Sequence, residues 1–308
     1  MLSYEAYSNN NTMSLGSDNH SSVHPKIMAA LLAANSGKAP SYGTDSISNE
    51  VAEIFKKHFG EKTSAFFVFN GTAANTIALK ALLKPYQSVL CSDVAHLHWD
   101  ECGAPEALTG CKLVLVKSTD GKVTIDSLEK HMIRLGDQPF TQPCVLSITQ
   151  PTELGTLYTY EELKNLISWA QSKGLKTHID GARYVHASTR LGLNFKQLGQ
   201  DLGVDIISFG GTKNGLMFGE AVLCFDDELA NDLKFIRKQL LQLPSKSRYL
   251  AAQFKAFFED DLWAEMANHS HKMAITLYEG LKDISQITIA HPTECLSLIH
   301  ISEPTRPY

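Results

Sequence analysis

Short hydrophobic runs and longer segments of helical periodicity alternate along most of this 308-residue chain. The runs are rich in Val, Ile, Leu and Phe and are bounded by glycine, which is typical of buried β-strands. Strands that alternate with helices indicate an α/β fold with a mostly parallel sheet. The predicted strands are Ala65–Phe69, Ser88–Cys91, Leu113–Val116, Val145–Ile148, Lys176–Ile179, Val204–Phe209 and Glu220–Phe225.

Helical spacing of apolar residues occurs between these strands and dominates the chain after the last of them. Pro25–Asn35, the segment that ends at Gly60 and the segment after Asn70 all repeat apolar residues three to four positions apart. Thr159 and Glu162 form a capping-box pair at the start of another helix. The helices predicted after the last strand are Asp226–Leu243, Ser247–Phe258 and Leu262–Leu281.

The overall composition bounds the class of protein. The net charge is −5 at pH 7, so the chain lacks the basic surface typical of nucleic-acid binding. No apolar run approaches the roughly 18 residues of a membrane span, and the first ten residues lack the basic and apolar regions of a secretory signal. Six scattered cysteines without a CxxC pair fit reduced thiols, so we predict a cytoplasmic protein.

Histidine and cysteine spacing does not favour a metal site. His96 and His98 are two residues apart and would face opposite sides of any strand. No cluster of cysteine or histidine accompanies them in the sequence, so we predict no bound metal.

Lys213 has an unusual setting, the glycine-rich run Ser208–Gly215 between two predicted strands. Burial lowers the pKa of a lysine toward the neutral amine, and a neutral amine can attack a carbonyl to form a Schiff base. Gly210 and Gly211 before the lysine would let a ligand approach the backbone closely. The competing interpretation is a solvated surface charge, which most lysines at strand ends are.

Two other junctions carry residues that suit charged ligand groups. Gly71 and Thr72 open a predicted helix, whose free N–H groups and dipole bind phosphate, although Gly-Thr also serves as a plain turn. Asp180 ends a predicted buried strand, where ligands collect in open α/β sheets, although a strand-end Asp is often a helix cap. Arg183 is an anion contact or a surface charge.

These features together match the requirements of pyridoxal 5'-phosphate. A lysine forms the Schiff base, a helix N-terminus takes the phosphate, and a carboxylate pairs with the protonated ring nitrogen. The protonated ring then draws electrons from the substrate Cα. We therefore predict that this cofactor binds where Lys213, Asp180 and the Gly71-Thr72 turn meet.

Four motifs, in this order along the chain, resemble those of the low-specificity L-threonine aldolases, which are fold-type-I pyridoxal phosphate enzymes. The similarity runs from about Ser17 to about Glu294. It implies a large domain with a mostly parallel mixed sheet flanked by helices, and a smaller C-terminal domain. The motifs are Asn70–Asn75, Asp100–Glu106, His178–Arg183 and Phe209–Gly215.

The resemblance implies roles for residues around the cofactor. Lys213 would form the covalent link, and Asp180 would pair with the pyridine nitrogen. Gly71 and Thr72 would bind the phosphate. Arg248 is similar to the family arginine that assists the phosphate contact.

Further residues match family positions near the substrate. His96 is similar to the histidine whose ring stacks on the cofactor, which suits its flat face. Ser17 and Arg183 match residues that hold the substrate carboxylate, and Arg183 counts among the cofactor-binding residues as well. Tyr42 resembles a residue that is often supplied across a subunit interface, so a homodimer or homotetramer is implied.

The implied reaction is retro-aldol cleavage of L-threonine, L-allo-threonine and related β-hydroxy-α-amino acids to glycine and an aldehyde. This carbon–carbon lyase reaction serves threonine catabolism and glycine biosynthesis. The base that takes the β-hydroxyl proton is open between Glu153, where many relatives have histidine, and His96. Alternative interpretations are another pyridoxal phosphate lyase or transaminase on the same fold, or an inactive truncated relative.

The resemblance also divides the chain. We expect an N-terminal segment 1–16, a large cofactor-binding domain 17–245 and the start of a truncated small domain 246–294. The segment 295–308 is expected to be non-native, because most of it is similar to a translated sequencing adaptor. A further substrate-binding arginine of the family has no match, since Arg306 falls in that tail.

Overall fold

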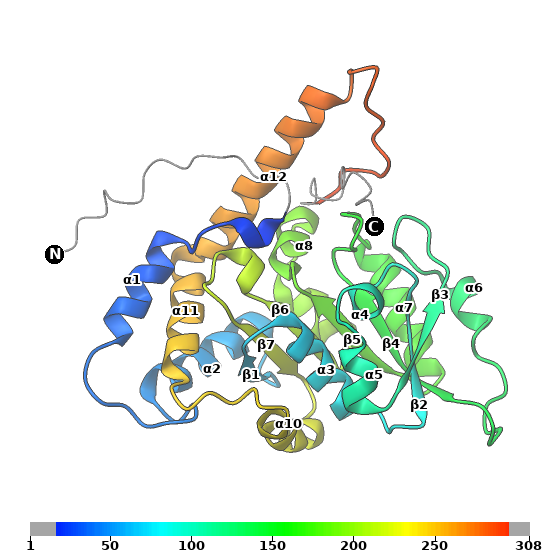
Figure 1. The fold of residues 1–308 in the computed structure, drawn as a ribbon, viewed down its shortest axis with the longest axis horizontal. Coiled ribbons are helices and arrows are strands. Elements are labelled where there is room, and N and C mark those ends of the chain that lie inside the picture. The colour runs from blue at the N-terminus through cyan, green and yellow to red at the C-terminus, as the bar shows by residue number, and fades with distance from the viewer. Residues whose placement is uncertain (1–16, 296–308) are drawn as a thin grey trace.

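The computed structural model describes residues 17–295, and residues 1–16 and 296–308 lie outside the described part. The predicted N-terminal segment and nearly all of the expected tail, Arg306 included, are therefore outside it. The described chain has a central sheet between two layers of helices (Figure 1). Each face of the sheet has its own buried apolar cluster, one beneath α2, α7 and α11 and the other beneath α3 and α10.

Seven strands form this sheet in the order β1-β7-β6-β5-β4-β2-β3. Strand β7 runs antiparallel to both of its neighbours, and the remaining pairs are parallel. The predicted mostly parallel sheet is confirmed, and every predicted strand is present. The strands are β1 (Ser64–Val68), β2 (Gln87–Ser92), β3 (Lys112–Val116), β4 (Gln142–Thr149), β5 (Lys176–Gly181), β6 (Ile206–Gly210) and β7 (Glu220–Cys224).

The long helices follow the predicted apolar spacing. The capping box before α7 is present, because Thr159 accepts from the Glu162 N–H and the Glu162 carboxylate accepts from the Thr159 N–H. These helices are α1 (Pro25–Ala34), α2 (Ser46–Phe59), α3 (Gly71–Leu82), α7 (Tyr160–Ser172), α10 (Asp227–Gln239), α11 (Arg248–Phe258) and α12 (Leu262–Leu281).

Several short helices were not predicted, since fewer than three turns show little periodicity. They are α4 (His96–Trp99), α5 (Ala104–Thr109), α6 (Ile125–Glu129), α8 (Tyr184–Leu191) and α9 (Phe195–Leu198). His96 and His98 therefore lie on one turn of helix rather than on a strand.

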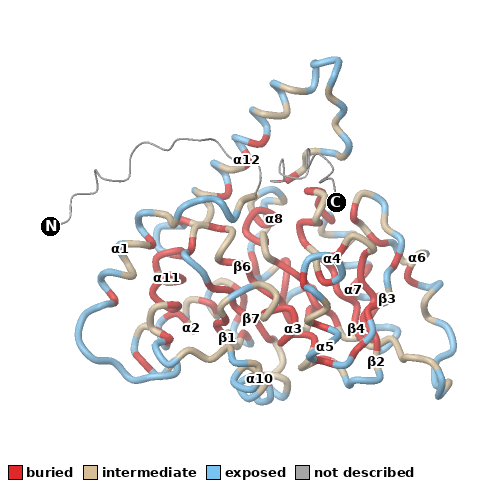
Figure 2. The backbone as a smooth tube through the Cα atoms, in the orientation of Figure 1, coloured by how far each residue is buried: buried red, intermediate tan, exposed pale blue. Residues whose placement is uncertain are grey.

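A cluster of phenylalanine rings joins α2 and α11 to the sheet. The Phe55 ring of α2 lies 5.8 Å from that of Phe209 in β6, and 5.4 and 5.1 Å from those of Phe254 and Phe258 in α11. All four side chains are buried, and Figure 2 shows that much of the backbone of the sheet is buried as well. Helix α11 thus packs into the core of the preceding chain, and the predicted domain border at 245/246 stays a prediction.

The last helix leaves this compact body. Helix α12 begins in the core at Leu262 and then projects outward (Figure 1), with its far half exposed in Figure 2. The chain then returns to the body, where the Cys295 N–H donates to the Gly155 carbonyl at 2.9 Å. Within the described residues, no helix is long and apolar enough to cross a membrane.

The strand directions decide where functional residues can meet. Because β7 alone is reversed within the sheet of the described chain, the other strands end at one common edge. Ligands in open α/β sheets bind at this carboxyl edge. The segments after β1, β2, β4, β5 and β6 all reach it, and these segments carry most of the predicted site residues.

Candidate active site

A cavity of about 340 Å³ opens at the carboxyl edge of the sheet. It collects residues from five strand ends that are distant in the sequence. The predicted site residues that line it are Gly71, Thr72, His96, Glu153, Asp180, Arg183 and Lys213. Sequence positions up to 142 residues apart therefore share one chamber, as the resemblance implied.

Lys213 lies on a single helical turn directly after β6. Burial lowers the pKa of its ammonium group, and the nearby Arg183 charge lowers it further. Both effects favour the neutral amine, which is the nucleophilic form. The close packing behind this turn requires glycine at position 210, where a Cβ atom would collide with the Ala182 backbone.

The lysine turn is held from behind by Glu220, the first residue of β7. Its carboxylate accepts from the Gly211 N–H at 2.6 Å. Complete burial raises the pKa of Glu220 to about 7. Sequence reasoning missed this residue, although an acid at the start of an otherwise apolar strand was a usable signal.

The N-terminus of α3 faces the same cavity. Asn70 caps the helix by accepting from the Ala73 N–H at 2.9 Å. Within the described chain, the Gly71 and Thr72 N–H groups have no hydrogen-bond acceptor. A Cβ at Gly71 would meet nothing within 4 Å. Free donors at a helix start, with open space in front of them, suit a phosphate group.

Asp180 lies near the end of β5 and is 4% exposed. Its Oδ1 accepts from the Ala182 N–H at 3.1 Å, and its Oδ2 accepts from Asn75 Nδ2 at 2.8 Å. These bonds fix the carboxylate while each oxygen retains a further lone pair. A protonated ring nitrogen in the cavity would be a suitable partner for it.

His96 lies at the start of α4, at the rim of the cavity. Its Nδ1 lies 2.9 Å from Glu101 Oε1. That hydrogen bond raises the pKa of His96, although burial opposes it. The negative charges of Asp180 and Glu101 also raise this pKa.

Glu153 follows β4 and is nearly enclosed. Its Oε1 accepts from the His96 backbone N–H at 2.8 Å and from Thr149 Oγ1 at 2.7 Å. Its Oε2 is buried and has no partner among the described residues. Burial raises the pKa of this carboxyl group, so a protonated Glu153 is favoured more than in water.

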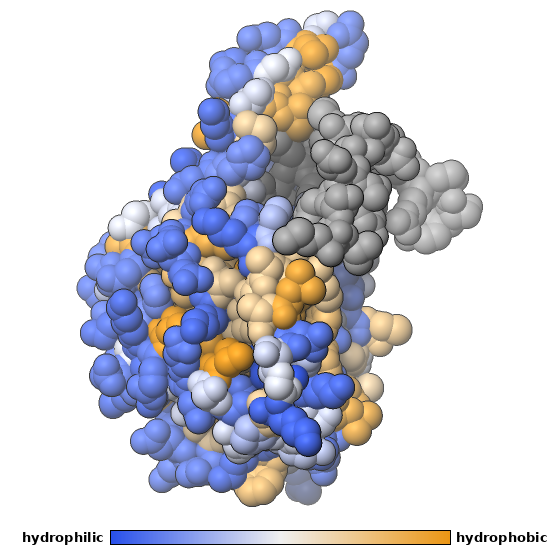
Figure 3. All heavy atoms as spheres, turned by 90° about the vertical axis from the view of Figure 1, so that its left-hand side faces the viewer, coloured by the Kyte–Doolittle hydropathy of each residue, from blue (hydrophilic) through white to orange (hydrophobic). Residues whose placement is uncertain are grey.

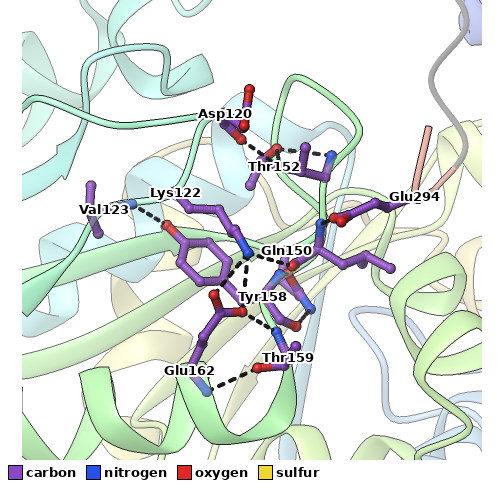
Figure 4. A network of polar contacts seen from close by, with 11 residues as sticks. Asp120, Lys122, Val123, Gln150, Thr152, Tyr158, Thr159, Glu162 and Glu294 are labelled. Atoms are coloured by element: carbon purple, nitrogen blue, oxygen red, sulfur yellow. Dashed lines mark hydrogen bonds and ion pairs between the residues drawn. The ribbon is translucent and has the colours of Figure 1, made fainter. Parts of the chain in front are cut away.

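The loop that carries Glu153 is clamped on both sides (Figure 4). The Gln150 side chain donates to the Tyr158 carbonyl and accepts from the Tyr158 N–H, while the Tyr158 hydroxyl accepts from the Val123 N–H. The Glu294 carboxylate accepts from the N–H of the preceding residue, Leu157, at 2.7 Å. These contacts hold the backbone of the loop on both sides of Glu153.

Arg183 is oriented by a second acid. Its Nε donates to Asp18 Oδ2 at 2.7 Å, and both side chains are largely buried. Burial opposes ionisation of Asp18, yet the Arg183 charge and hydrogen bond hold the pKa of Asp18 below its usual value. No hydrogen bond within the described chain engages the Nη1 or Nη2 groups of Arg183, so they can bind a carboxylate.

Three predicted residues lie outside the cavity. Ser17 caps a short turn by accepting from the Asn19 N–H, and Asn19 rather than Ser17 borders the cavity. Tyr42 is half exposed, and Arg248 donates to the Gly37 carbonyl at 3.3 Å. The structure therefore does not bring these three together with Lys213 in one chain.

The cavity also contains residues that sequence reasoning did not assign. Five of them fall inside motifs that carried the resemblance, so their presence there was the available signal: Asn70, Asn75, Glu101, Ala182 and Thr212. Apart from Glu220, no local pattern marked the others, which are Asn19, Phe69, Thr149 and Phe218. The unassigned lining residues are Asn19, Phe69, Asn70, Asn75, Glu101, Thr149, Ala182, Thr212, Phe218 and Glu220.

The residues present fit pyridoxal phosphate. The cavity offers a half-buried lysine with a lowered pKa, unoccupied N–H donors at α3 and a fixed, buried carboxylate. Lys213 would hold the aldehyde carbon, the α3 N-terminus the phosphate and Asp180 the ring nitrogen. This fold and this chemistry together define the class of fold-type-I pyridoxal phosphate enzymes.

Comparisons with known proteins agree with that class. The family described as Beta-eliminating lyase matches residues 14–303. Two low specificity L-threonine aldolases, from Pseudomonas aeruginosa and from a Pseudomonas strain, are each 40% identical; the aligned regions span 95% and 94% of this chain and 85% and 84% of those proteins. The chain therefore belongs to the beta-eliminating lyase family, in its low-specificity L-threonine aldolase branch.

Solved structures show the same relationship. A threonine aldolase from Leishmania major superposes with a TM-score of 0.86 at 30% identity, covering 91% of this chain and 82% of its own. An aromatic aminotransferase from Pyrococcus horikoshii, at 17% identity and a TM-score of 0.69, covers 90% of this chain and 75% of its own and shares the fold alone.

Proposed function

We propose that this chain is a pyridoxal phosphate-dependent lyase that cleaves L-threonine and L-allo-threonine to glycine and acetaldehyde. The observation that carries the proposal is the meeting of Lys213, Asp180 and the open N-terminus of α3 in one cavity. The 40% identity to two low specificity L-threonine aldolases supports the substrate class. Six scattered cysteines without a CxxC pair in the sequence support a cytoplasmic location.

The residues of the chain divide the work of the reaction. When bound, the cofactor supplies a carbonyl carbon for an amine and an electron sink for the breaking Cα–Cβ bond. Lys213, whose lowered pKa favours the neutral amine, would provide the nucleophile that holds the cofactor. Asp180 would hold the ring nitrogen protonated by charge pairing. Arg183 binds the substrate carboxylate through its free Nη groups and so orients the bond to be broken.

The β-hydroxyl proton is taken by a group on the His96 and Glu153 side of the cavity. We propose His96 as the base, because Glu101 engages Nδ1 and leaves Nε2 as the ring nitrogen that can reach a hydroxyl. Glu153 has a supporting role, because its Oε1 already accepts from the His96 backbone N–H and from Thr149 Oγ1.

The direct test is incubation of the purified holoenzyme with L-threonine, followed by measurement of glycine and acetaldehyde. We expect equal amounts of both products and no keto acid. Formation of 2-oxobutanoate or transfer of the amino group to a keto acid would overturn the aldolase assignment. L-Serine serves as a matched substrate, because it offers the same hydroxyl without the β-methyl group.

We further propose that the active protein is a homodimer or a tetramer of such dimers. An apolar groove of about 480 Å³ lies between α1 and the start of α11, and it shares Phe69 and Phe218 with the cavity. Figure 3 shows hydrophobic side chains on the side of the molecule that carries α1, and Leu32 there is 67% exposed. A second copy is the occupant that accounts for both the groove and the position of the predicted phosphate-binding Arg248.

Mixed oligomers test whether Arg248 acts in its partner's cavity. Lys213→Ala and Arg248→Ala proteins, each impaired alone, are unfolded together and refolded to form hybrids. If Arg248 acts across the interface, each hybrid dimer has one complete site and the mixture regains about a quarter of wild-type activity. If Arg248 acts within its own chain, no hybrid has a complete site and activity stays at the level of the separate variants.

A further inference from the structure

A hydrogen-bonded chain of side chains runs beneath the cavity and connects two of its walls. His96 Nδ1 lies 2.9 Å from Glu101 Oε1, and the same oxygen accepts from Asn75 Nδ2 at 2.8 Å. Asn75 Nδ2 also donates to Asp180 Oδ2 at 2.8 Å. The two hydrogens of one amide group thus join two carboxylates that would otherwise repel each other.

These linking residues are deeply buried. Glu101 is 3% exposed and Asn75 is 2% exposed. The second carboxylate oxygen of Glu101 is buried without a partner among the described residues. Leaving a buried oxygen unpaired is unfavourable, so a role for Glu101 solely in stabilising the fold gives a poor account of its geometry.

We propose that Glu101 and Asn75 are positioning residues of the proposed aldol reaction: Glu101 fixes the ring of His96 with Nε2 available to the cavity, and Asn75 ties this arrangement to Asp180. This proposal rests on the proposed function only in naming the aldol reaction as the one that these two residues serve. Because Glu101 accepts a hydrogen bond from Nδ1 of His96, it fixes the proton on Nδ1 and leaves Nε2 unprotonated in the neutral ring. Asn75 bonds to both Glu101 and Asp180, so it fixes the position of His96 relative to the Asp180 carboxylate.

The electrostatics agree with this arrangement. Burial is the main cause that raises the pKa of Glu101, and the hydrogen bond that His96 donates to Glu101 is the main cause that raises the pKa of His96. The pair therefore keeps one shared proton more firmly than either group would in water. The other charged groups facing His96 are Asp180, which reinforces this effect, Lys213, which opposes it, and Glu153, which binds its backbone N–H.

The test compares the holoenzyme with Glu101→Gln, which keeps the shape and an acceptor oxygen but removes the charge. Asp100→Asn is the matched control, because Asp100 is the exposed neighbour in the same segment. Titration of His96 is followed through the 13Cε1 resonance of labelled histidine, assigned by its loss in His96→Gln. In parallel, the pH dependence of kcat/KM for L-threonine is recorded.

We expect the titration midpoint of His96 to fall by about one pH unit or more in Glu101→Gln, with the acid limb of the pH profile moving in the same direction. Asp100→Asn should change neither the His96 midpoint nor the pH profile. Glu101→Asp, which keeps the charge, should give a His96 midpoint between those of Glu101→Gln and the wild-type protein. An unchanged midpoint and profile in a folded Glu101→Gln protein would overturn the proposal. If that variant does not fold, the wild-type protein still decides, since a His96 that titrates below its ordinary range contradicts the proposed contact.

The two readouts separate this proposal from the proposed function. A shifted His96 titration in a protein without aldolase activity would refute the function while supporting the positioning role. Aldolase activity with a His96 titration that ignores Glu101 would refute the positioning role alone.

Discussion

Lys213→Ala should abolish turnover, with a loss of about 10⁴-fold or more in kcat. The reason is that Lys213 is the lysine of the described chain that lines the cavity, and its lowered pKa supplies the neutral amine that the reaction needs. The phosphate contacts at α3 do not depend on this side chain, so weak cofactor binding should remain. Steady-state assays of acetaldehyde release measure the loss of kcat, and the visible absorbance of the cofactor measures the binding that remains.

The matched control for this substitution is Lys164→Ala. Lys164 is exposed on α7, where alanine suits the helix, and it does not line the cavity. It should keep wild-type kcat and the wild-type absorbance. A Lys213→Ala protein that folds and retains more than a few per cent of wild-type kcat would contradict the assignment of the lysine.

The second large effect is expected for Asp180→Asn, a change that keeps the size of the side chain and removes its charge. Without the carboxylate, nothing at that position holds a proton on the ring nitrogen, and the developing negative charge loses its sink. We expect kcat to fall about 10²- to 10³-fold, with KM for L-threonine changed much less because Arg183 is untouched. Rate measurements across substrate concentration separate the two constants.

Asp232→Asn is the control for this second prediction, since Asp232 is an exposed acid on α10. Because Asp180 also accepts from Asn75, the thermal unfolding of Asp180→Asn should be measured to exclude a collapsed site. A stable Asp180→Asn protein with wild-type kcat would show that the carboxylate does not act on the ring. A rise in KM with unchanged kcat would place Asp180 in substrate binding instead.

Much of this architecture was predictable because the local signals agreed. All seven strands were predicted, since each is an apolar run bounded by turn residues, and the long helices show clear spacing. The short helices α4 and α9 have too few residues to show a period. Their positions depend on packing, which the local sequence does not encode.

Some residues of the cavity were likewise predictable from the sequence and others were not. Lys213 and Asp180 could be proposed because each follows or ends a strand, and parallel strands bring such ends together. Asn75 and Glu101 lie inside motifs of the resemblance, but the network that gives them a role could not be proposed, because the hydrogen bonds of Asn75 to Glu101 and to Asp180 span 26 and 105 residues. The proposed placement of Arg248 depends on a second molecule, so neither its sequence context nor a single chain could reveal its function.

The phenylalanine cluster has a consequence for how this protein can be divided. Phe254, Phe257 and Phe258 of α11 are completely or nearly buried and come after the predicted border at 245/246. Removing one buried Phe side chain typically costs 3–5 kcal/mol, of the same order as the whole stability of a domain, roughly 5–15 kcal/mol. A cofactor-binding fragment for display, fusion or split-reporter use should therefore keep α11 and be cut only beyond it.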